Sequence, residues 1–184
     1  MVTSSTIKHF KRVKIMKLIG KGSFTKAYLN ESGKVILKTS DPVKECMALG
    51  WFPNSKLFPK MEYLESGVYS MEYLGKTPKA LKSELRPRQY RLYKALRDVF
   101  NGGLGLCGVQ SNDLYYHWCS VFSDLPSEFN KEKESLLMAL DTLVNFGPDI
   151  AFEISPRNIR VKNGFLVLLD CFFLRSELNK VKGW

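Results

Sequence analysis

A change of pattern at residues 75–78 constrains the fold of this 184-residue chain more than any other feature. Before this point, short runs of β-branched and aromatic residues are separated by turn pairs at 32–33 and 66–67, which is typical of strands. After it, residues 87–100 and 130–146 place apolar side chains at helical spacing. We therefore expect a sheet half followed by a helical half, with ligands bound in the cleft between them.

One helix is expected within the sheet half. Asp41 precedes Pro42, and apolar residues follow at helical spacing up to residue 52. Aspartate is favoured as a helix N-cap and proline at the first helical position, so this pair marks a helix start. The predicted division is residues 1–75 for the sheet half and 76–184 for the helical half.

The composition is that of an ordinary globular protein, with 45% hydrophobic and 25% charged residues. No apolar run is long enough to span a bilayer, and residues 1–17 lack the apolar core of a signal peptide, so we expect a cytoplasmic protein with no membrane partner. The four cysteines show no CxxC pairing, which favours reduced thiols. With only His9 and His117, a histidine-rich zinc site and a Ser-His-Asp hydrolase are both poorly supported.

The formal net charge of +10 favours acidic partners and phosphate-bearing ligands. The basic residues are nevertheless spread from Lys8 to Lys182, and the sequence has neither an RNA-binding aromatic motif nor zinc-finger spacing. Direct nucleic-acid binding is therefore the least favoured function.

The segment LIGKGSFTKAYL places Gly20 and Gly22 between two expected strands. Glycine has no Cβ, so a backbone turn built on it can approach phosphate oxygens and offer N–H donors. The Rossmann and Walker motifs need a helix after their glycines, and the strand–loop–strand order excludes both. A glycine-rich hairpin without a ligand is the alternative.

A lysine, Lys38, ends the apolar run VILK about one hairpin further on. A lysine with buried strand neighbours can point inward only if something neutralises it. Glu45, on the expected helix, and the phosphates of a nucleotide are both suitable partners. The alternative is a strand-end lysine that reaches solvent.

The segment DIAFEISPRNIRVKNGFLVLLDCFF places Glu153 five residues before Asn158, with Asp170 after a hydrophobic run. Asn163-Gly164 predicts a hairpin between Asn158 and Asp170. Such residues are common in ordinary turns, and a metal–nucleotide site is the other explanation.

Four segments, GKGSFTKAY, VILK, YSMEYLG and FEISPRNIRVKNGFLVLLDCF, follow the order of the protein-kinase signatures. The compact form most resembles the small serine/threonine kinases of tailed bacteriophages, over residues 17–172. The resemblance implies a minimal bilobal protein-kinase-like fold of the α+β class, with an antiparallel N-terminal sheet lobe and a truncated helical lobe. It also implies that the protein transfers the ATP γ-phosphate to host proteins in the host cytosol during infection.

The resemblance implies nucleotide-binding roles at eight positions. A glycine-rich loop would cover the phosphates, a lysine with a glutamate partner would hold the α- and β-phosphates, and a connector would bind adenine. These positions are Gly20, Gly22, Ser23, Lys38, Glu45, Met71, Glu72 and Leu74. Of the connector residues, Glu72 and Leu74 would use backbone groups, whereas the Met71 side chain would line the pocket behind adenine.

The catalytic roles fall on Glu153, Lys38 and Asp170, with Glu153 in the place of the catalytic base. Asn158 and Asp170 would bind Mg²⁺, which prefers hard oxygen ligands and needs few protein groups when phosphates are also bound. A five-residue gap between Glu153 and Asn158 lets one loop turn both side chains into the same cleft.

The sequence also departs from the kinase pattern. Thr25 replaces the third loop glycine, Glu153 replaces an aspartate, and Ser155 replaces a lysine that steadies the γ-phosphate. DCF stands in place of DFG, and the chain ends 14 residues after Asp170, which leaves no room for an activation segment. These departures support an alternative hypothesis, a pseudokinase that inhibits a host protein by binding it. The positive charge would then help to capture an acidic partner, such as an enzyme that works on nucleic acid.

Overall fold

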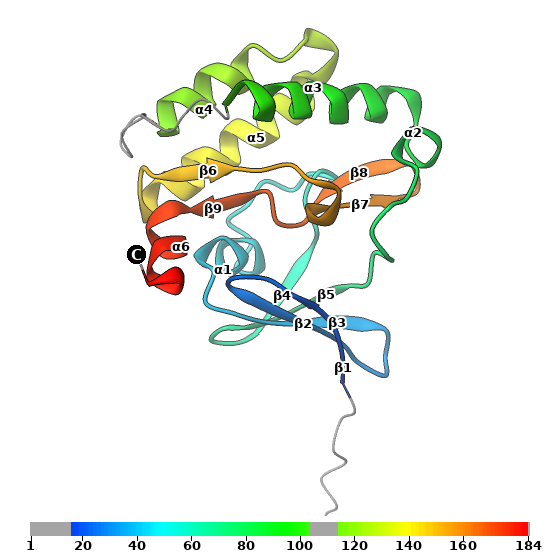
Figure 1. Ribbon diagram of the computed structural model, residues 1–184, viewed down its shortest axis with the longest axis vertical. Coiled ribbons are helices and arrows are strands. Elements are labelled where there is room, and N and C mark those ends of the chain that lie inside the picture. Colours follow the sequence, from blue (N-terminus) through cyan, green and yellow to red (C-terminus); the bar gives the residue numbers. More distant parts are fainter. Residues whose placement is uncertain (1–15, 104–113, 184) are drawn as a thin grey trace, which may run out of the picture.

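The computed structural model of the protein describes residues 16–103 and 114–183. A five-stranded antiparallel sheet forms one half, helices form the other, and two short antiparallel strand pairs lie between them (Figure 1). The predicted α+β class and the order of sheet followed by helices are therefore confirmed. The strands are β1 (Lys17–Lys21), β2 (Thr25–Leu29), β3 (Lys34–Thr39), β4 (Met61–Glu65), β5 (Val68–Glu72), β6 (Ile150–Phe152), β7 (Ile159–Lys162), β8 (Phe165–Leu168) and β9 (Phe172–Leu174). The α-helices are α1 (Pro42–Ala48), α2 (Leu81–Glu84), α3 (Pro87–Gly103), α4 (Leu114–Ser123), α5 (Asn130–Leu143) and α6 (Arg175–Lys182).

The large sheet has the strand order β1-β2-β3-β5-β4. Side chains of a strand alternate between its two faces, and on β3 the residues Val35, Leu37 and Thr39 are the buried ones. Directly paired residues share a face, so Met71 of β5, which pairs with Val35, lies on the same face. This buried face of the sheet is the one that packs into the core.

Helix α1 begins as the sequence predicts. Asp41 is the N-cap and accepts a hydrogen bond from the Val43 N–H at 2.9 Å, and Pro42 is the first helical residue. The helix packs against β4 and β5. Four of its residues are buried: Val43, Lys44, Cys46 and Met47. The helix ends before Gly50, whose positive φ of 76° favours glycine.

Two short strand pairs connect the halves. Strands β7 and β8 form the predicted hairpin, with Asn163 at φ 53° and Gly164 at φ 80° in its turn. These positive values at both central residues are those of a type I′ turn, for which Asn-Gly is favoured. Strands β6 and β9 pair further along, with Phe152 opposite Phe172. That second pair was not predicted from the sequence.

Two helices were also missed. Residues 175–182 form α6, and Asp149 holds the start of this helix by accepting a hydrogen bond from the Ser176 N–H at 2.5 Å. Helix α4 buries Trp118, whose indole N–H donates to the Ile150 carbonyl at 3.0 Å. Trp118 is therefore part of the core, whereas Tyr116 of the same helix is 72% exposed.

Among the described residues, Cys46, Cys119 and Cys171 are free cysteines, and Cys107 lies outside the described ranges, as does His9. None of the helices in 16–103 and 114–183 is both long and apolar enough to cross a membrane.

Candidate functional site

The loop that carries Glu153 and Asn158 is tied to the segment that carries Asp170 by backbone hydrogen bonds. The Glu153 N–H donates to the Cys171 carbonyl at 2.8 Å. The Asn158 carbonyl accepts from the Leu169 N–H at 2.8 Å and from the Asp170 N–H at 3.4 Å. The structure therefore brings the three predicted residues Glu153, Asn158 and Asp170 together, although they span 18 positions of sequence.

An aromatic cluster packs directly behind this loop. Phe152 precedes Glu153 and Phe172 follows Cys171, and their ring centroids lie 5.2 Å apart. Phe122 of α4 contacts both rings, at 5.1 Å and 6.2 Å. Phe58, in the segment before β4, reaches Phe172 at 6.4 Å. The cluster therefore fixes the two acid-bearing segments relative to each other and to the sheet half.

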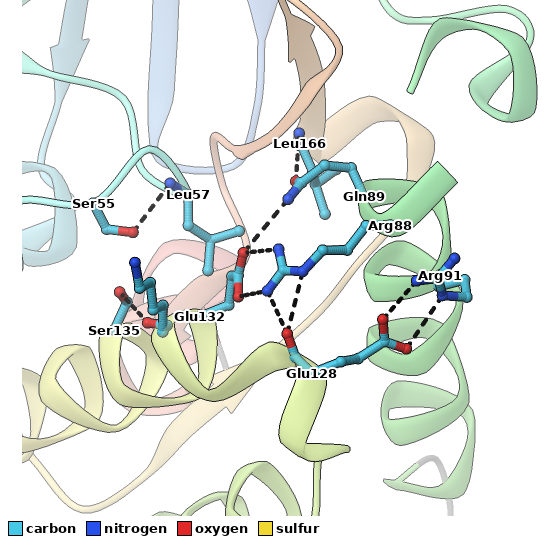
Figure 2. A network of polar contacts seen from close by, with 10 residues as sticks. Ser55, Leu57, Arg88, Gln89, Arg91, Glu128, Glu132, Ser135 and Leu166 are labelled. Atoms are coloured by element: carbon cyan, nitrogen blue, oxygen red, sulfur yellow. Dashed lines mark hydrogen bonds and ion pairs between the residues drawn. The ribbon is translucent and has the colours of Figure 1, made fainter. Parts of the chain in front are cut away.

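A polar network anchors the β7–β8 hairpin to the helical half (Figure 2). The Gln89 side chain on α3 accepts from the Leu166 N–H of β8 at 3.1 Å and donates to Glu132 of α5 at 3.4 Å. Arg88 donates to both carboxylate oxygens of Glu132, at 2.6 and 2.7 Å. Such two-pronged arginine–carboxylate contacts are among the stronger polar contacts in proteins. The strand that leads to Asp170 is thereby held in place.

Lys44 of α1 contacts Asp170. Its side chain is only 5% exposed, and its Nζ donates to Asp170 Oδ1 at 2.8 Å and to the Leu169 carbonyl at 2.7 Å. A third oxygen, Asp41 Oδ2, lies 3.8 Å away. Burial lowers the pKa of Lys44, but the nearby carboxylates Asp170 and Asp41 outweigh this, so its pKa is raised and it stays charged.

The two carboxylates around Lys44 are not equivalent. Burial raises the pKa of Asp41 to about 6, although Lys44 acts to lower it. Asp41 Oδ2 is buried and has no hydrogen-bond partner within the described chain, because Lys44 directs its hydrogen bonds to Asp170 and Leu169 instead. The Asp170 side chain is 47% exposed and therefore open to a ligand.

The position of Lys38 differs from the one expected. Lys38 lies on the exposed face of β3, opposite to Val35, Leu37 and Thr39, with its Nζ 5.9 Å from the centre of the Tyr28 ring. No ion pair joins it to Glu45 in the described part of the chain. The expectation of a Lys38 that points inward and pairs with Glu45 is therefore wrong, because one step of strand alternation places this lysine on the exposed face of β3.

The glycine-rich loop joins β1 to β2 as expected. The Gly22 N–H donates to the Thr25 carbonyl at 2.8 Å, and Ser23 at the loop tip is exposed. A Cβ added at Gly20 or Gly22 would meet only ordinary contacts, at 3.7 and 3.8 Å. Neither glycine is therefore required by the fold of the loop itself. Thr25 donates to Thr39 Oγ1 at 2.7 Å, so it joins the loop to β3.

The connector residues Met71, Glu72 and Leu74 line a cavity of about 500 Å³. Three lysines, Lys56, Lys60 and Lys162, also line it, together with apolar side chains such as Phe58, Phe165 and Val167. Glu72 forms an ion pair with Lys162. Gly20, Gly22, Asn158 and Asp170 are not among the residues that line this cavity.

Arg160 of β7 lies against the connector. Its Nε donates to the Gly75 carbonyl at 3.1 Å, and Nη1 donates to the carbonyls of Arg157 and Ile159 at 3.0 and 2.6 Å. Burial lowers the pKa of this half-buried guanidinium. The structure thus places a cation two residues after Asn158, where the sequence analysis assigned no role.

The donor set at Asn158 and Asp170 suits Mg²⁺ only in the presence of a ligand with its own oxygens. Within the described residues, no group of three or more His, Cys, Asp or Glu side chains could hold a metal ion. One amide oxygen and one carboxylate are hard donors, and Mg²⁺ characteristically completes its shell with waters and substrate phosphates. The residues therefore fit a metal that arrives with a nucleotide.

Lys44 and Arg97 were not predicted from the sequence. Arg97 of α3 donates from Nη1 to the Ile154 carbonyl at 2.5 Å, which fixes the loop next to Glu153. Lys44 had one usable signal, since it is a charged residue directly after Val43 and before Cys46 and Met47, which make up the buried side of α1. Arg97 had none, because its partner is a backbone carbonyl 57 residues away.

No protein-family model matches the sequence, and no curated protein matches it. Among solved structures, the chain is similar to the streptomycin–ATP–APH(2")-IIa ternary complex, with a TM-score of 0.40 and 13% sequence identity. The similarity covers 87% of this chain and 67% of that chain. A similarity at this level does not assign a function to this protein.

Proposed function

We propose that the protein is an ATP-dependent phosphotransferase that transfers the γ-phosphate to serine or threonine hydroxyls of other proteins. The proposed activity is that of the small phage kinases, which act on host proteins. The single observation that supports this most strongly is the backbone bonding of the loop, which holds Glu153, Asn158 and Asp170 in one place. All three residues are partly exposed, so their side chains are accessible to a ligand.

The residues would divide the work of binding ATP. Asn158 and Asp170 would hold Mg²⁺ on the phosphates, and that ion would neutralise their negative charge. The loop at Gly20 and Gly22 would cover the phosphates with backbone N–H groups. The fold of the loop does not itself require glycine at either position, which supports a role for these glycines in binding. Glu72 and Leu74 would bind adenine through the backbone, with Met71 behind it.

Glu153 would act as the catalytic base. In the proposed step the acceptor hydroxyl oxygen attacks the γ-phosphorus while the bond to the bridging oxygen of ADP breaks. The hydroxyl proton passes to the Glu153 carboxylate, and ADP leaves. Phosphoryl transfer asks a protein chiefly for positioning and charge stabilisation. The backbone of Glu153 is positioned by its bond to the Cys171 carbonyl and by the bond of Arg97 to the next residue, Ile154.

A second candidate function, binding without phosphate transfer, is favoured by Arg160. Its guanidinium bonds the Gly75 carbonyl, within the connector that adenine would need. A cation bound one residue beyond Leu74 would crowd a purine base placed against the connector. The protein would then act as a pseudokinase that captures an acidic host protein, helped by its net charge of +10.

One labelling experiment separates the two candidates. The wild-type protein, Asp170→Ala and Asp98→Asn are each incubated with radiolabelled ATP, Mg²⁺ and a bacterial lysate. Asp98 is an exposed residue of α3, so its variant controls for the loss of one negative charge. We expect phosphoserine and phosphothreonine with the wild type and Asp98→Asn, and a loss of roughly a thousandfold with Asp170→Ala, because losing the metal ligand removes several kcal/mol of charge stabilisation. Equal labelling by Asp170→Ala would overturn the proposal, and a wild type that labels nothing but retains a lysate protein would favour the second candidate.

A further inference from the structure

We propose that Lys44 of α1, and not Lys38 of β3, is the lysine that positions Asp170 for phosphate transfer. This inference rests on the proposed function, since it assigns a role within the same site. Lys44 is a positioning residue: it acts on the nucleotide through Asp170 and the strand end that carries it.

The contacts of Lys44 all converge on the site. Both of its hydrogen bonds go to consecutive residues, Leu169 through the carbonyl at 2.7 Å and Asp170 through Oδ1 at 2.8 Å. One bond therefore fixes the backbone just before Asp170 and the other fixes the rotation of the carboxylate. Because Lys44 engages Oδ1, the second oxygen of the half-exposed carboxylate stays available to a metal.

A purely structural explanation of Lys44 is weak. Its neighbours on α1, Val43, Cys46 and Met47, are apolar and buried, and the polar partners of its amine are the Leu169 carbonyl and the carboxylates of Asp170 and Asp41. Burying a charged amine is costly, and an ion pair of this kind adds little net stability compared with apolar residues in place of both partners. A lysine in this place is explained if the charge at Asp170 must be balanced and its carboxylate held.

Asp41 completes the arrangement from the other side. It caps α1 through Oδ1, and its Oδ2 lies 3.8 Å from Lys44 Nζ, within the reach of an ion pair but beyond a hydrogen bond. The lysine thus has a second carboxylate that keeps its charge balanced whenever a metal shares Asp170. Asp41 thus has the role of ion-pair partner to the lysine, which the sequence pattern assigned to Glu45.

Among the described residues, no hydrogen bond or ion pair joins Lys38 to Asp170, whose partner is Lys44. Its side chain leaves β3 on the face that carries Lys34 and Ile36, whereas Thr39, the next residue, is uncharged and is buried on the opposite face. The residue that bonds the Asp41 N–H is Thr39, at 3.0 Å. The lysine that contacts Asp170 is therefore Lys44 of α1, the helix that follows β3.

The test compares Lys44→Met, Lys44→Gln and Lys38→Met with the wild type. The measured quantities are kcat and the KM for ATP at saturating Mg²⁺, with the fraction of protein that binds ATP determined for each variant. That fraction corrects kcat for any loss of folded protein. Lys44→Gln removes the charge but keeps a donor for the Leu169 carbonyl. If Lys44→Met does not fold, the kcat of Lys44→Gln per ATP-binding molecule tests the inference instead.

We expect kcat per ATP-binding molecule to fall by about a hundredfold in both Lys44 variants, because a catalytic group displaced by about 1 Å costs that much. The KM for ATP should stay within about threefold, since the base-binding connector is untouched, and Lys38→Met should match the wild type. Wild-type kcat in a folded Lys44 variant, or a large loss in Lys38→Met, would overturn the inference while leaving the proposed function intact. A wild type without any phosphate transfer overturns both.

Discussion

Lys44 Nζ lies 2.8 Å from Asp170 Oδ1, although the two residues are 126 positions apart in the chain. The contact joins α1, in the sheet half, to the end of β8 in the second half. It is made by a side chain that is 5% exposed and one that is 47% exposed, so it lies at the boundary between the core and an open surface. The Lys44–Asp170 ion pair therefore links the position of α1 to the position of the segment that carries Asp170.

The aromatic cluster behind the loop should be a major source of stability. We expect Phe152→Ala to lower the free energy of unfolding by about 3–5 kcal/mol, because Phe152 is 3% exposed and its loss leaves a cavity beside Phe122 and Phe172. Urea denaturation followed by tryptophan fluorescence measures this. Phe146→Ala is the matched control, since that ring is 41% exposed and should cost under about 1 kcal/mol. Similar losses in both variants would show that the cluster is not the core described above.

Asp41 should make stability depend on pH. Burial raises its pKa from 3.8 to about 6 in the folded protein, so between these values the folded state binds a proton that the unfolded state releases. Stability from this group is therefore greatest at low pH and falls as pH rises through about 6, by an amount on the order of 3 kcal/mol. The free energy of unfolding, measured between pH 4 and 7, should fall more with rising pH in the wild type than in Asp41→Asn. Parallel pH profiles would contradict this account.

The buried thiols should be unreactive in the native protein. Burial raises the pKa of Cys46 to about 12 and raises the pKa of Cys171 as well, so neither is a thiolate at neutral pH. Cys171 also donates to the Asn158 carbonyl, at 3.6 Å. Alkylation with iodoacetamide, located by mass spectrometry, should leave Cys46 and Cys171 unmodified until denaturant is added. Rapid labelling of Cys171 in the native protein would mean that the loop carrying Glu153 and Asn158 opens far more readily than its hydrogen bonds indicate.

Glu153 should be needed for its carboxylate. General bases contribute about 10²- to 10⁴-fold, so we expect Glu153→Gln to lower kcat by that factor with little change in the KM for ATP. Glu153→Asp retains the charge one methylene further from the acceptor hydroxyl and should lie between Glu153→Gln and the wild type. Steady-state assays of the three proteins with one peptide substrate measure this order. Activity of Glu153→Gln equal to the wild type would remove Glu153 from the proposed mechanism.

Local sequence signals predicted the elements whose causes are local. The Asp41-Pro42 helix start and the Asn163-Gly164 hairpin were both correct, because a cap and a type I′ turn are set by neighbouring residues. Helix α6 was missed because its N-terminus is held by Asp149, 27 residues away in sequence. A tertiary cap of this kind leaves no pattern in the segment that it stabilises.

The choice of lysine shows the same limit within the site. Val35, Ile36 and Leu37 are all apolar, so the sequence of β3 has no alternation from which to tell which face Lys38 takes. A strand shifted by one residue exchanges its two faces, and only the packing of the sheet decides between them. By contrast, Glu153, Asn158 and Asp170 lie within one stretch of the chain, and the loop and the β7–β8 hairpin between them bring their backbones together.

Calorimetric titration of ATP into the protein, with and without Mg²⁺, tests the central claim that Asn158 and Asp170 form a metal–nucleotide site. We predict that Mg²⁺ tightens ATP binding by the wild type and by Asp98→Asn by at least about tenfold, and that this gain is lost in Asp170→Asn. ATP binding that does not depend on Mg²⁺, or a gain that survives intact in Asp170→Asn, would contradict the account.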